Sequence, residues 1–416
     1  MDTLDDLTWL AAHFLFAYPF VLSWYWMAGA LIFYVVRERG QAPYTQPPTL
    51  PHYPPVSILL PCFNESEQVR DTIAALARTQ YPNFEILAID DGSSDDTAEQ
   101  LQLLLDEYPQ LRVVLLDSNQ GKSTALNAGL QASQADIVVC VDGDALLDPH
   151  AVTWFVNAFE RDASLGGLTG NPQIRNRSSL LGRLQVGEFS SIVGMIKRTQ
   201  SVWGSILTVS GVICAFRKQA IVDTGGWNPA ALTDDMDLTL RMQASGWRVT
   251  YEPNALCWIL MPERLGGLWR QRLRWSEGGV AAVMATFPKA VRARRWPLLA
   301  VLANYVVSLL WAALIVLFAS VWLLDLVVDL ENIDFNPLPT WWGTVLAVTY
   351  LVQSFIGILL DARYEKGRVR FIFWIIWYPL LFWFLQTCAA VTGLLRYVFK
   401  PKSKKGNWVS PDRGLT

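Results

Sequence analysis

The sequence is poor in the side chains on which zinc sites and many nucleophilic enzymes depend. It has only three histidines and five cysteines in 416 residues. The cysteines form no C-x-x-C pair and no cluster with a histidine; they are Cys62, Cys140, Cys214, Cys257 and Cys388. These spacings exclude a zinc site, and we expect the cysteines to be small buried side chains in a reducing compartment. Catalysis would have to rest on carboxylates and on a cation that prefers oxygen ligands.

A strong excess of positive charge is also missing. The formal net charge is −3, which argues against a nucleic-acid partner. Four long stretches contain no Asp, Glu, Lys or Arg; they are Trp9–Val36, Leu298–Leu324, Trp341–Leu360 and Phe371–Leu395. Each is long enough to cross a bilayer core of about 30 Å at about 1.5 Å per helical residue. We therefore predict about four membrane segments, one before and three after a polar domain.

The first hydrophobic stretch differs from a cleaved signal peptide in its flanking charges. Asp2, Asp5 and Asp6 precede it, where a signal peptide would carry positive charge. A permanent anchor is therefore favoured. Arg37 and Arg39 follow it directly, and basic residues gather on the cytoplasmic side of membrane proteins. The polar domain is expected in the cytoplasm.

The basic C-terminal tail conflicts with four complete crossings. Three crossings after a cytoplasmic domain would leave residues 400–416 outside, although their lysines favour the inside. Phe371–Leu395 contains Pro379 among aromatic residues. This segment is either re-entrant or interfacial, or the tail is an exception to the charge rule, and the sequence leaves both interpretations open.

The polar region has the pattern of an α/β domain. Short apolar runs predict strands at Val56–Leu60, Glu85–Ile89, Arg112–Leu116 and Asp136–Val141. Helical patterns lie between them, at Ser66–Thr79, Asp95–Glu107 and Ser123–Ser133. This alternation predicts a mostly parallel sheet with helices on both faces. The less regular part that follows predicts a helix at Leu180–Arg198, a strand at Ile206–Val209 and a helix at Asp235–Ala244.

These patterns divide the chain into six parts. They are a membrane anchor over 1–40, a proline-rich linker over 41–55, a cytoplasmic domain over 56–262, interfacial amphipathic helices over 263–296, C-terminal membrane segments over 297–399 and a basic tail over 400–416. Arg and Trp alternate with Leu in the interfacial part, which is typical of helices that lie on a membrane surface.

Carboxylates follow two of the predicted strands. Asp91 comes after the second, and Asp142 and Asp144 flank a glycine after the fourth. Because ligands of parallel sheets bind beyond the carboxyl ends of the strands, we expect these side chains at one binding edge. Asp142 and Asp144 suit Mg²⁺ or Mn²⁺, which take a few carboxylate oxygens and leave other positions to a diphosphate. A D-x-D triplet alone is common in surface loops, and its position at a strand end is what favours a metal site.

Two of these assignments have simpler alternatives. Asp91 suits the N–H of a nucleobase, but an Asp here can also cap the helix that starts near Asp95. Asp95 and Asp96 can provide that cap themselves, so ligand contact is favoured for Asp91. Lys122 opens another helix, where it suits a phosphate or base edge, although a solvated lysine explains the pattern equally well.

Two further clusters lie later in the chain. Asp234 and Asp235 are adjacent at a predicted helix start, where mutual repulsion would raise the pKa of one carboxyl toward that of a general base; a double helix cap is the alternative. Gln271, Arg274 and Trp275 lie at i, i+3 and i+4, on one helical face. They offer an amide, a guanidinium for a departing diphosphate and an indole on which a sugar can stack. An interfacial helix rich in Arg and Trp is compatible with this interpretation.

Together these motifs resemble the pattern D, DxD, (E/D)D and QxxRW of the processive membrane glycosyltransferases of family 2. Within that family, several stretches are similar to the bacterial poly-β-1,6-N-acetylglucosamine synthases: Gln185–Glu188, Ile196–Gln200, Thr208–Gly211, Tyr251–Pro253 and Cys257–Pro262. The resemblance implies a GT-A-like nucleotide-sugar domain that uses UDP-N-acetylglucosamine and Mg²⁺ or Mn²⁺.

The resemblance also implies a role for each motif residue. Asp91 would bind the uracil end of the donor, Asp142 and Asp144 the diphosphate and metal, and Asp235 would be the base. Gln271, Arg274 and Trp275 would surround the donor diphosphate and the acceptor end. The first acid of the pair is Asp234 where relatives often have Glu, which leaves its role open.

The implied reaction is a single displacement with inversion, which extends a polysaccharide of bacterial biofilms and moves it through the inner membrane. The implied partners are the growing polysaccharide, the lipid bilayer, a small membrane accessory subunit and downstream export machinery. Two alternatives share the fold: a transferase with a lipid acceptor, and a synthase of the hyaluronan, chitin or cellulose type. A transporter or receptor with a nucleotide-sensing domain is a third, which the near absence of charge in the hydrophobic stretches disfavours.

Overall fold

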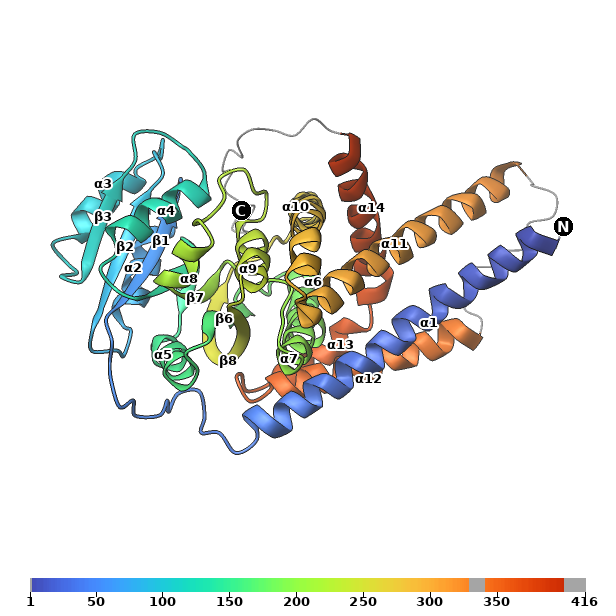
Figure 1. The fold of residues 1–416 in the computed structure, drawn as a ribbon, viewed down its shortest axis with the longest axis horizontal. Helices are drawn as coiled ribbons and strands as arrows, with labels where there is room; N and C mark the ends of the chain where they lie inside the picture. The colour runs from blue at the N-terminus through green and yellow to red at the C-terminus, as the bar shows by residue number, and fades with distance from the viewer. Residues whose placement is uncertain (1, 329–340, 400–416) are drawn as a thin grey trace.

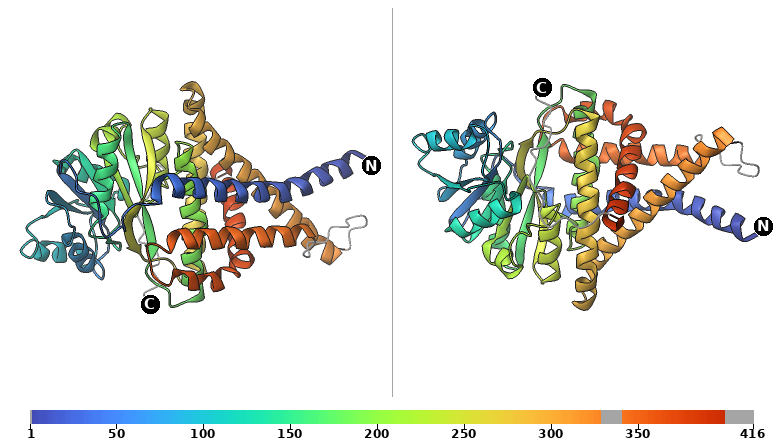
Figure 2. Two further views of the ribbon diagram at one scale, coloured as in Figure 1. Left: turned by 90° about the horizontal axis from the view of Figure 1, so that it is seen from below. Right: turned by 90° about the horizontal axis from the view of Figure 1, so that it is seen from above.

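The computed structural model describes residues 2–328 and 341–399. The predicted basic tail at 400–416 lies outside the described residues. An α/β domain occupies one end of the molecule, and long helices extend from the other end (Figure 1). In both views of Figure 2 the blue N-terminal helix and the orange helices leave the domain on the same side.

The α/β domain is built on one eight-stranded sheet with the order β3-β2-β1-β4-β7-β6-β8-β5. The strands are β1 Val56–Cys62, β2 Phe84–Asp90, β3 Leu111–Leu115, β4 Ile137–Val141, β5 Leu146–Leu147, β6 Leu165–Ile174, β7 Ile213–Arg217 and β8 Arg248–Ile259. β3, β2, β1 and β4 run parallel, and so do β6 and β8, whereas β7 is antiparallel to both of its neighbours. The predicted mostly parallel α/β fold is confirmed, including its first four strands.

Both faces of the sheet are covered because its central strands are apolar on both sides. All residues of β1 and β4 are buried. Along β1, Ile58 belongs to the hydrophobic cluster on one face and Leu59 to the cluster on the other. The covering helices include α2 Val69–Ala77, α3 Thr97–Leu104, α4 Lys122–Ala132, α5 Ala151–Arg161 and α8 Lys218–Asp223. The first three confirm the predicted helices: α2 and α3 are shorter than predicted, and α4 is shifted by one residue.

The predicted strand at Ile206–Val209 is wrong. These residues form a loop between α7 (Met195–Val202) and β7. Their apolar side chains do pack into the core, but the backbone N–H of Ile206 donates to Gln243 Oε1 at 2.9 Å and that of Val209 donates to Thr239 Oγ1 at 3.1 Å. Side chains of helix α9 (Asp234–Ala244) thus replace a neighbouring strand. The apolar pattern was correct for burial and misleading for secondary structure.

The predicted helix at Leu180–Arg198 is present and contains an irregular centre. It consists of α6 Leu180–Glu188, a π-helical segment at Phe189–Gly194 and α7. The predicted interfacial segment contains one long helix, α10, over Leu265–Arg292. The predicted helix at Asp235–Ala244 is confirmed by α9.

Three helices are long and apolar enough to cross a membrane, by length and composition, among the residues that the structure describes. They are α1 Asp2–Phe33 with its π-helical continuation Tyr34–Glu38, α11 Trp296–Val328 and α12 Trp341–Asp361. The predicted count of about four is therefore slightly too high. The fourth stretch, Phe371–Leu395, is divided between α13 (Ile372–Ile375), a π-helical turn at Pro379–Trp383 and α14 (Phe384–Phe399).

Part of the fourth stretch packs on protein. Tyr378 and Phe382 are buried in a cluster with Leu184 of α6 and Leu268 of α10. α14 then approaches α10 so closely that a Cβ on Gly393 would lie 2.7 Å from the Cβ of Ser276. Pro379 interrupts the regular α-helix at the start of the π-helical turn.

Buried charges join the ends of the membrane helices to the α/β domain. Arg198 of α7 has no exposed side-chain surface; its Nε donates to Glu38 Oε1 at 2.7 Å and its Nη2 to Asp361 Oδ1 at 2.9 Å. Glu38 ends the continuation of α1, and Asp361 ends α12. One arginine thus fixes two of the long helices to the domain.

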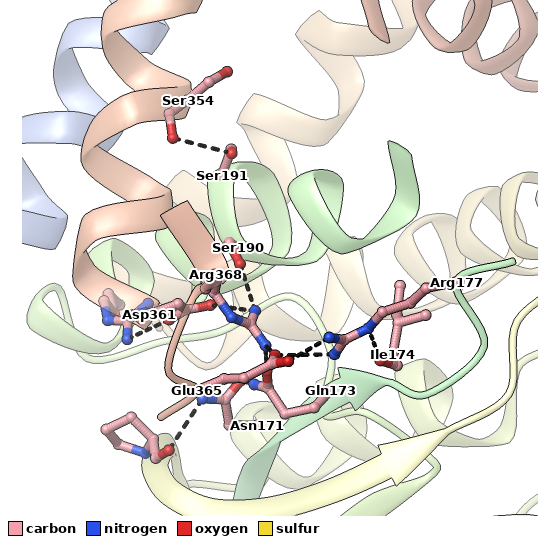
Figure 3. Close-up of polar contacts among 12 residues, drawn as sticks. Asn171, Gln173, Ile174, Arg177, Ser190, Ser191, Ser354, Asp361, Glu365 and Arg368 are labelled. Atoms are coloured by element: carbon pink, nitrogen blue, oxygen red, sulfur yellow. Dashed lines mark hydrogen bonds and ion pairs between the residues drawn. The ribbon is translucent and has the colours of Figure 1, made fainter. Parts of the chain in front are cut away.

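The loop after α12 adds a second buried arginine (Figure 3). Arg368 Nη1 donates to Ser190 Oγ at 2.8 Å, and its Nη2 donates to Gln173 of β6 and to Glu365 Oε2 at 2.8 Å. Glu365 is also bonded by Arg177. The loop that follows the last long helix is therefore held at the C-terminal end of β6.

Replacing Arg198 with methionine should destabilise the protein strongly. The change leaves the buried Glu38 and Asp361 with only their longer contacts of 3.7 Å to Arg363 and Arg368. Removing one partner of a buried ion pair costs about 3–5 kcal/mol of unfolding free energy. Thermal unfolding of the detergent-solubilised protein measures the loss. Arg70→Met is the matched control, because Arg70 and its partner Glu107 are half exposed and such pairs contribute less than about 1 kcal/mol. Equal melting temperatures for the two variants would contradict this role for Arg198.

Candidate active site

Asp91 holds the loop that precedes α4. It is fully buried just after β2, and its two carboxylate oxygens accept from the backbone N–H groups of Gln120 at 3.0 Å and Gly121 at 2.8 Å. Burial raises the pKa of Asp91, and the two N–H groups oppose that change. At the start of α3 it is Asp95, and not Asp91, that accepts from the backbone N–H of Thr97, at 3.1 Å. Asp91 is thus not the cap, and its contact with a nucleobase stays a prediction.

Asp142 and Asp144 follow β4 in a tightly packed turn. A Cβ on the intervening Gly143 would lie 2.9 Å from Glu65 Cγ, so this position has no room for a side chain. Asp144 is buried, and Asp142 is partly exposed. Asp142 Oδ1 accepts from Lys122 Nζ at 2.5 Å.

Lys122 joins two of the predicted acidic clusters. Its Nζ lies 2.5 Å from Asp142 Oδ1 and 3.9 Å from Asp234 Oδ2. Burial alone would lower the pKa of Lys122, but the two carboxylates raise it above its usual value. The lysine is therefore a charged bridge between the end of β4 and the start of α9, and the interpretation as a solvated lysine is wrong.

Asp235 lies at the start of α9, partly exposed. Its Oδ1 accepts from the backbone N–H of Met236 at 2.8 Å, and its Oδ2 from that of Gly211 at 3.3 Å. Burial and the charge of Asp234 raise the pKa of Asp235 to about 6, against the lowering effect of Lys122, the Met236 N–H and Arg274. A carboxyl with this pKa is ionised at neutral pH and is basic enough to accept a proton.

The QxxRW residues lie on α10 with different degrees of exposure. Arg274 is exposed, and its Nη1 donates to the carbonyl of Leu232, just before the acidic pair, at 3.4 Å. Trp275 is partly buried under the guanidinium of Arg272, whose Cζ lies 4.5 Å from a ring centroid. Gln271 Oε1 is buried and has no hydrogen-bond partner among the described residues.

Arg272, which sequence reasoning did not include in the site, anchors this helix. It is buried, and its Nη2 donates to Glu188 Oε2 of α6 at 2.8 Å. The sequence did offer one sign of this role: Arg272 is a charged residue within the QxxRW motif to which no ligand was assigned. The structure thus brings Asp142, Lys122, Asp234, Asp235 and Arg274 together. Trp275 follows Arg274 on α10 and packs against the hydrophobic core.

Asp142 and Asp144 supply two protein carboxylates at the predicted metal site. The described residues contain no group of three or more His, Cys, Asp or Glu side chains that could hold a metal by themselves. A cation at this position would thus depend on oxygens from a ligand, as Mg²⁺ commonly does with phosphates. The metal assignment stays a prediction.

Comparison with known proteins places the chain in a family. Residues 54–278 match the family described as "Glycosyltransferase like family 2". The chain is 34% identical over 407 residues to a protein of Staphylococcus aureus (strain COL) named poly-beta-1,6-N-acetyl-D-glucosamine synthase, covering 97% of this chain and 98% of the relative. The chain belongs to glycosyltransferase family 2. A synthase of the same name from Staphylococcus epidermidis is 33% identical over 412 residues.

The fold agrees with this family. A mannosyltransferase from Pyrobaculum calidifontis, solved with GDP-Man and Mn²⁺, superposes with a TM-score of 0.57 over 92% of this chain and 99% of its own. The identity is 17%, so this likeness concerns the fold alone. The predicted family and the GT-A-like fold of this glycosyltransferase are thereby confirmed.

The pH dependence of the glycosyltransferase should report Asp235. With the ionised carboxylate as the predicted base, kcat/KM should fall as the pH drops through about 6, the pKa to which burial and Asp234 raise this group. Asp235→Asn should reduce kcat by about 10²- to 10⁴-fold, the usual contribution of a general base. Asp106→Asn, a change on the exposed turn after α3, is the control. Wild-type activity in Asp235→Asn would remove Asp235 from the mechanism.

Proposed function

We propose that this glycosyltransferase extends poly-β-1,6-N-acetylglucosamine from UDP-N-acetylglucosamine by a processive, inverting reaction. The observation that carries the proposal is the 34% identity to named poly-beta-1,6-N-acetyl-D-glucosamine synthases, which extends over 97% of the chain. The identity includes the long helices as well as the α/β domain. The convergence of Lys122, Asp142 and the Asp234–Asp235 pair supports a nucleotide-sugar reaction at this site.

In the proposed reaction Asp235 accepts the proton of the acceptor hydroxyl. The hydroxyl oxygen forms a bond to the anomeric carbon of the donor as the bond from that carbon to the diphosphate breaks, and UDP leaves with its electron pair. Attack opposite to the leaving group inverts the configuration. The raised pKa of Asp235, about 6, suits this proton transfer near neutral pH.

Cationic side chains would stabilise the leaving diphosphate. Lys122 is charged and lies between the two acidic clusters, and the exposed Arg274 lies beside Leu232 at the start of α9. Asp142 and Asp144 have the oxygen donors that a hard divalent cation prefers. Mg²⁺ or Mn²⁺, when bound there, would neutralise further charge on the diphosphate. Trp275 offers a ring for the acceptor sugar, and Asp91 fixes the loop beside the nucleotide.

The same proposal assigns a membrane topology. α1, α11 and α12 would cross the bacterial inner membrane with the catalytic domain in the cytoplasm. The two crossings after the domain, α11 and α12, bring the chain back to the cytoplasmic side, so α13, α14 and the basic tail would lie there as well. This arrangement removes the conflict between the lysines of the tail and a fourth crossing. A small accessory subunit and export machinery would act on the product beyond this chain.

The product distinguishes this function from its alternatives. Purified enzyme in lipid nanodiscs, given radiolabelled UDP-N-acetylglucosamine and Mg²⁺, should make a high-mass polymer with 1,6 linkages, measured by size exclusion and linkage analysis. Parallel reactions with UDP-glucose and UDP-glucuronate test the other synthases. A single sugar on a lipid-extractable product would favour a lipid acceptor, and another linkage would favour a different polymer.

The DxD carboxylates should control the response to metal. Asp142→Asn and Asp144→Asn each remove a hard oxygen ligand, so the Mn²⁺ concentration for half-maximal UDP release should rise about tenfold or more, a loss of about 1.4 kcal/mol. Chelation should abolish the wild-type activity, and Mg²⁺ or Mn²⁺ should restore it. Asp162→Asn, at the other end of the domain, is the control. Full activity after chelation would exclude a metal requirement.

A further inference from the structure

Lys197 is a buried lysine with no acidic partner. It lies on α7, is 5% exposed and forms no ion pair within the described part of the chain. Its Nζ donates instead to Thr169 Oγ1 at 2.9 Å and to Ser210 Oγ. Burial lowers the pKa of Lys197 to about 7, against the opposing charge of Asp235. A buried ammonium held only by neutral hydroxyls is costly, so this placement needs a reason.

The hydroxyls of Thr169 and Ser210 connect Lys197 to the loop that contacts Asp235. Thr169 Oγ1 also accepts from the backbone N–H of Ser210 at 2.9 Å, so Lys197, Thr169 and Ser210 fix one another. The next residue, Gly211, donates its backbone N–H to Asp235 Oδ2 at 3.3 Å. A Cβ on Gly211 would lie 3.3 Å from the same oxygen, so the loop approaches the carboxylate as closely as a glycine allows.

The charge of Lys197 is also directed at Asp235. The titratable groups that act on Lys197 from the packed elements are Asp235 of α9 and Cys214 of β7, and the ring of Tyr251 on β8 has its centroid 6.0 Å from Nζ. The charges of Asp234, Lys122 and Arg274 also act on the pKa of Asp235. Lys122, however, bonds Asp142 and lies near Asp234. Lys197 forms no such pair, so its charge is not already neutralised by another acid.

We propose that Lys197 is a positioning residue, which holds the Ser210–Gly211 loop against Asp235 and stabilises the ionised carboxylate of the base. The inference rests on the proposed role of Asp235, and it assigns the buried lysine a function that the QxxRW and DxD motifs do not include. Its two components, a hydroxyl-bonded loop and a through-space charge, can be separated by mutation.

Lys197→Met removes both components. We expect kcat to fall about 10- to 100-fold, the scale of a small misplacement of a catalytic group. The KM for UDP-N-acetylglucosamine should change little, because Lys197 is buried and its Nζ is bonded to Thr169 and Ser210. Loss of the positive charge makes Asp235 harder to ionise, so the acid limb of the kcat/KM profile should move to higher pH. Lys197→Arg should keep the limb near its wild-type position.

Ser210→Ala removes only the hydroxyl that holds the loop. It should lower kcat without moving the acid limb, since the ammonium remains. Lys218→Met is the matched control: Lys218 lies just beyond the other end of β7 and donates to the carbonyl of Ser133 at 2.7 Å, so it should leave kcat and the limb unchanged. Wild-type kcat and an unmoved limb in Lys197→Met would overturn the proposal. If Lys197→Met does not fold, wild-type kcat in Ser210→Ala overturns it instead.

UDP release by the wild type and by Asp235→Asn, measured in the same series, separates this inference from the proposed function. An inactive wild type, or an active Asp235→Asn, would contradict the proposed function. The role of Lys197 alone would be contradicted by a different result. In that case the wild type is active, Asp235→Asn is inactive, and Lys197→Met behaves as the wild type.

Discussion

The active site depends on how one lysine is shared among several carboxylates. Asp142, Asp234 and Asp235 approach one another from β4 and α9, and their mutual repulsion would oppose that arrangement. Lys122 offsets it, but unequally: its Nζ lies 2.5 Å from Asp142 Oδ1 and 3.9 Å from Asp234 Oδ2. Asp235 receives only a weaker, longer-range effect, and its pKa stays raised to about 6. The basicity that the proposed reaction requires of Asp235 is thus a consequence of unequal neutralisation.

Buried ion pairs also connect the site to the surrounding helices. The guanidinium of Arg272 lies over the ring of Trp275 and pairs with Glu188, and Arg198 pairs with Glu38 and Asp361. Buried ion pairs add little net stability, but a register in which one partner is unpaired is strongly disfavoured. They therefore select a single arrangement of α1, α6, α10 and α12 around the catalytic domain. A site built from residues of separate elements needs such a selection, because small displacements weaken catalysis.

The sequence was informative where one local pattern decides the structure. Alternating apolar runs and helical patterns located β1 to β4 and the helices between them, and the strand ends placed Asp91 and Asp142. It failed where partners come from far along the chain. Nothing near Ile206–Val209 shows that Gln243 and Thr239 take the place of a strand. Nor does any local pattern show that Lys197 is buried against Thr169 and Ser210, since a lysine is usually exposed.

The broken fourth hydrophobic stretch shows why hydropathy alone overcounted the spans. Lipid and protein interiors both select apolar side chains, so composition cannot distinguish them. Packing can: Tyr378 and Phe382 lie in a cluster with residues of α6 and α10, and Gly393 approaches Ser276, the residue after Trp275. The helix with the QxxRW residues is thus held by α14 through Gly393, and by α6 through Arg272 and Glu188. Inside a bilayer this apolar segment would not contact the site. Packed against α10, it helps to hold the helix that carries Gln271, Arg274 and Trp275.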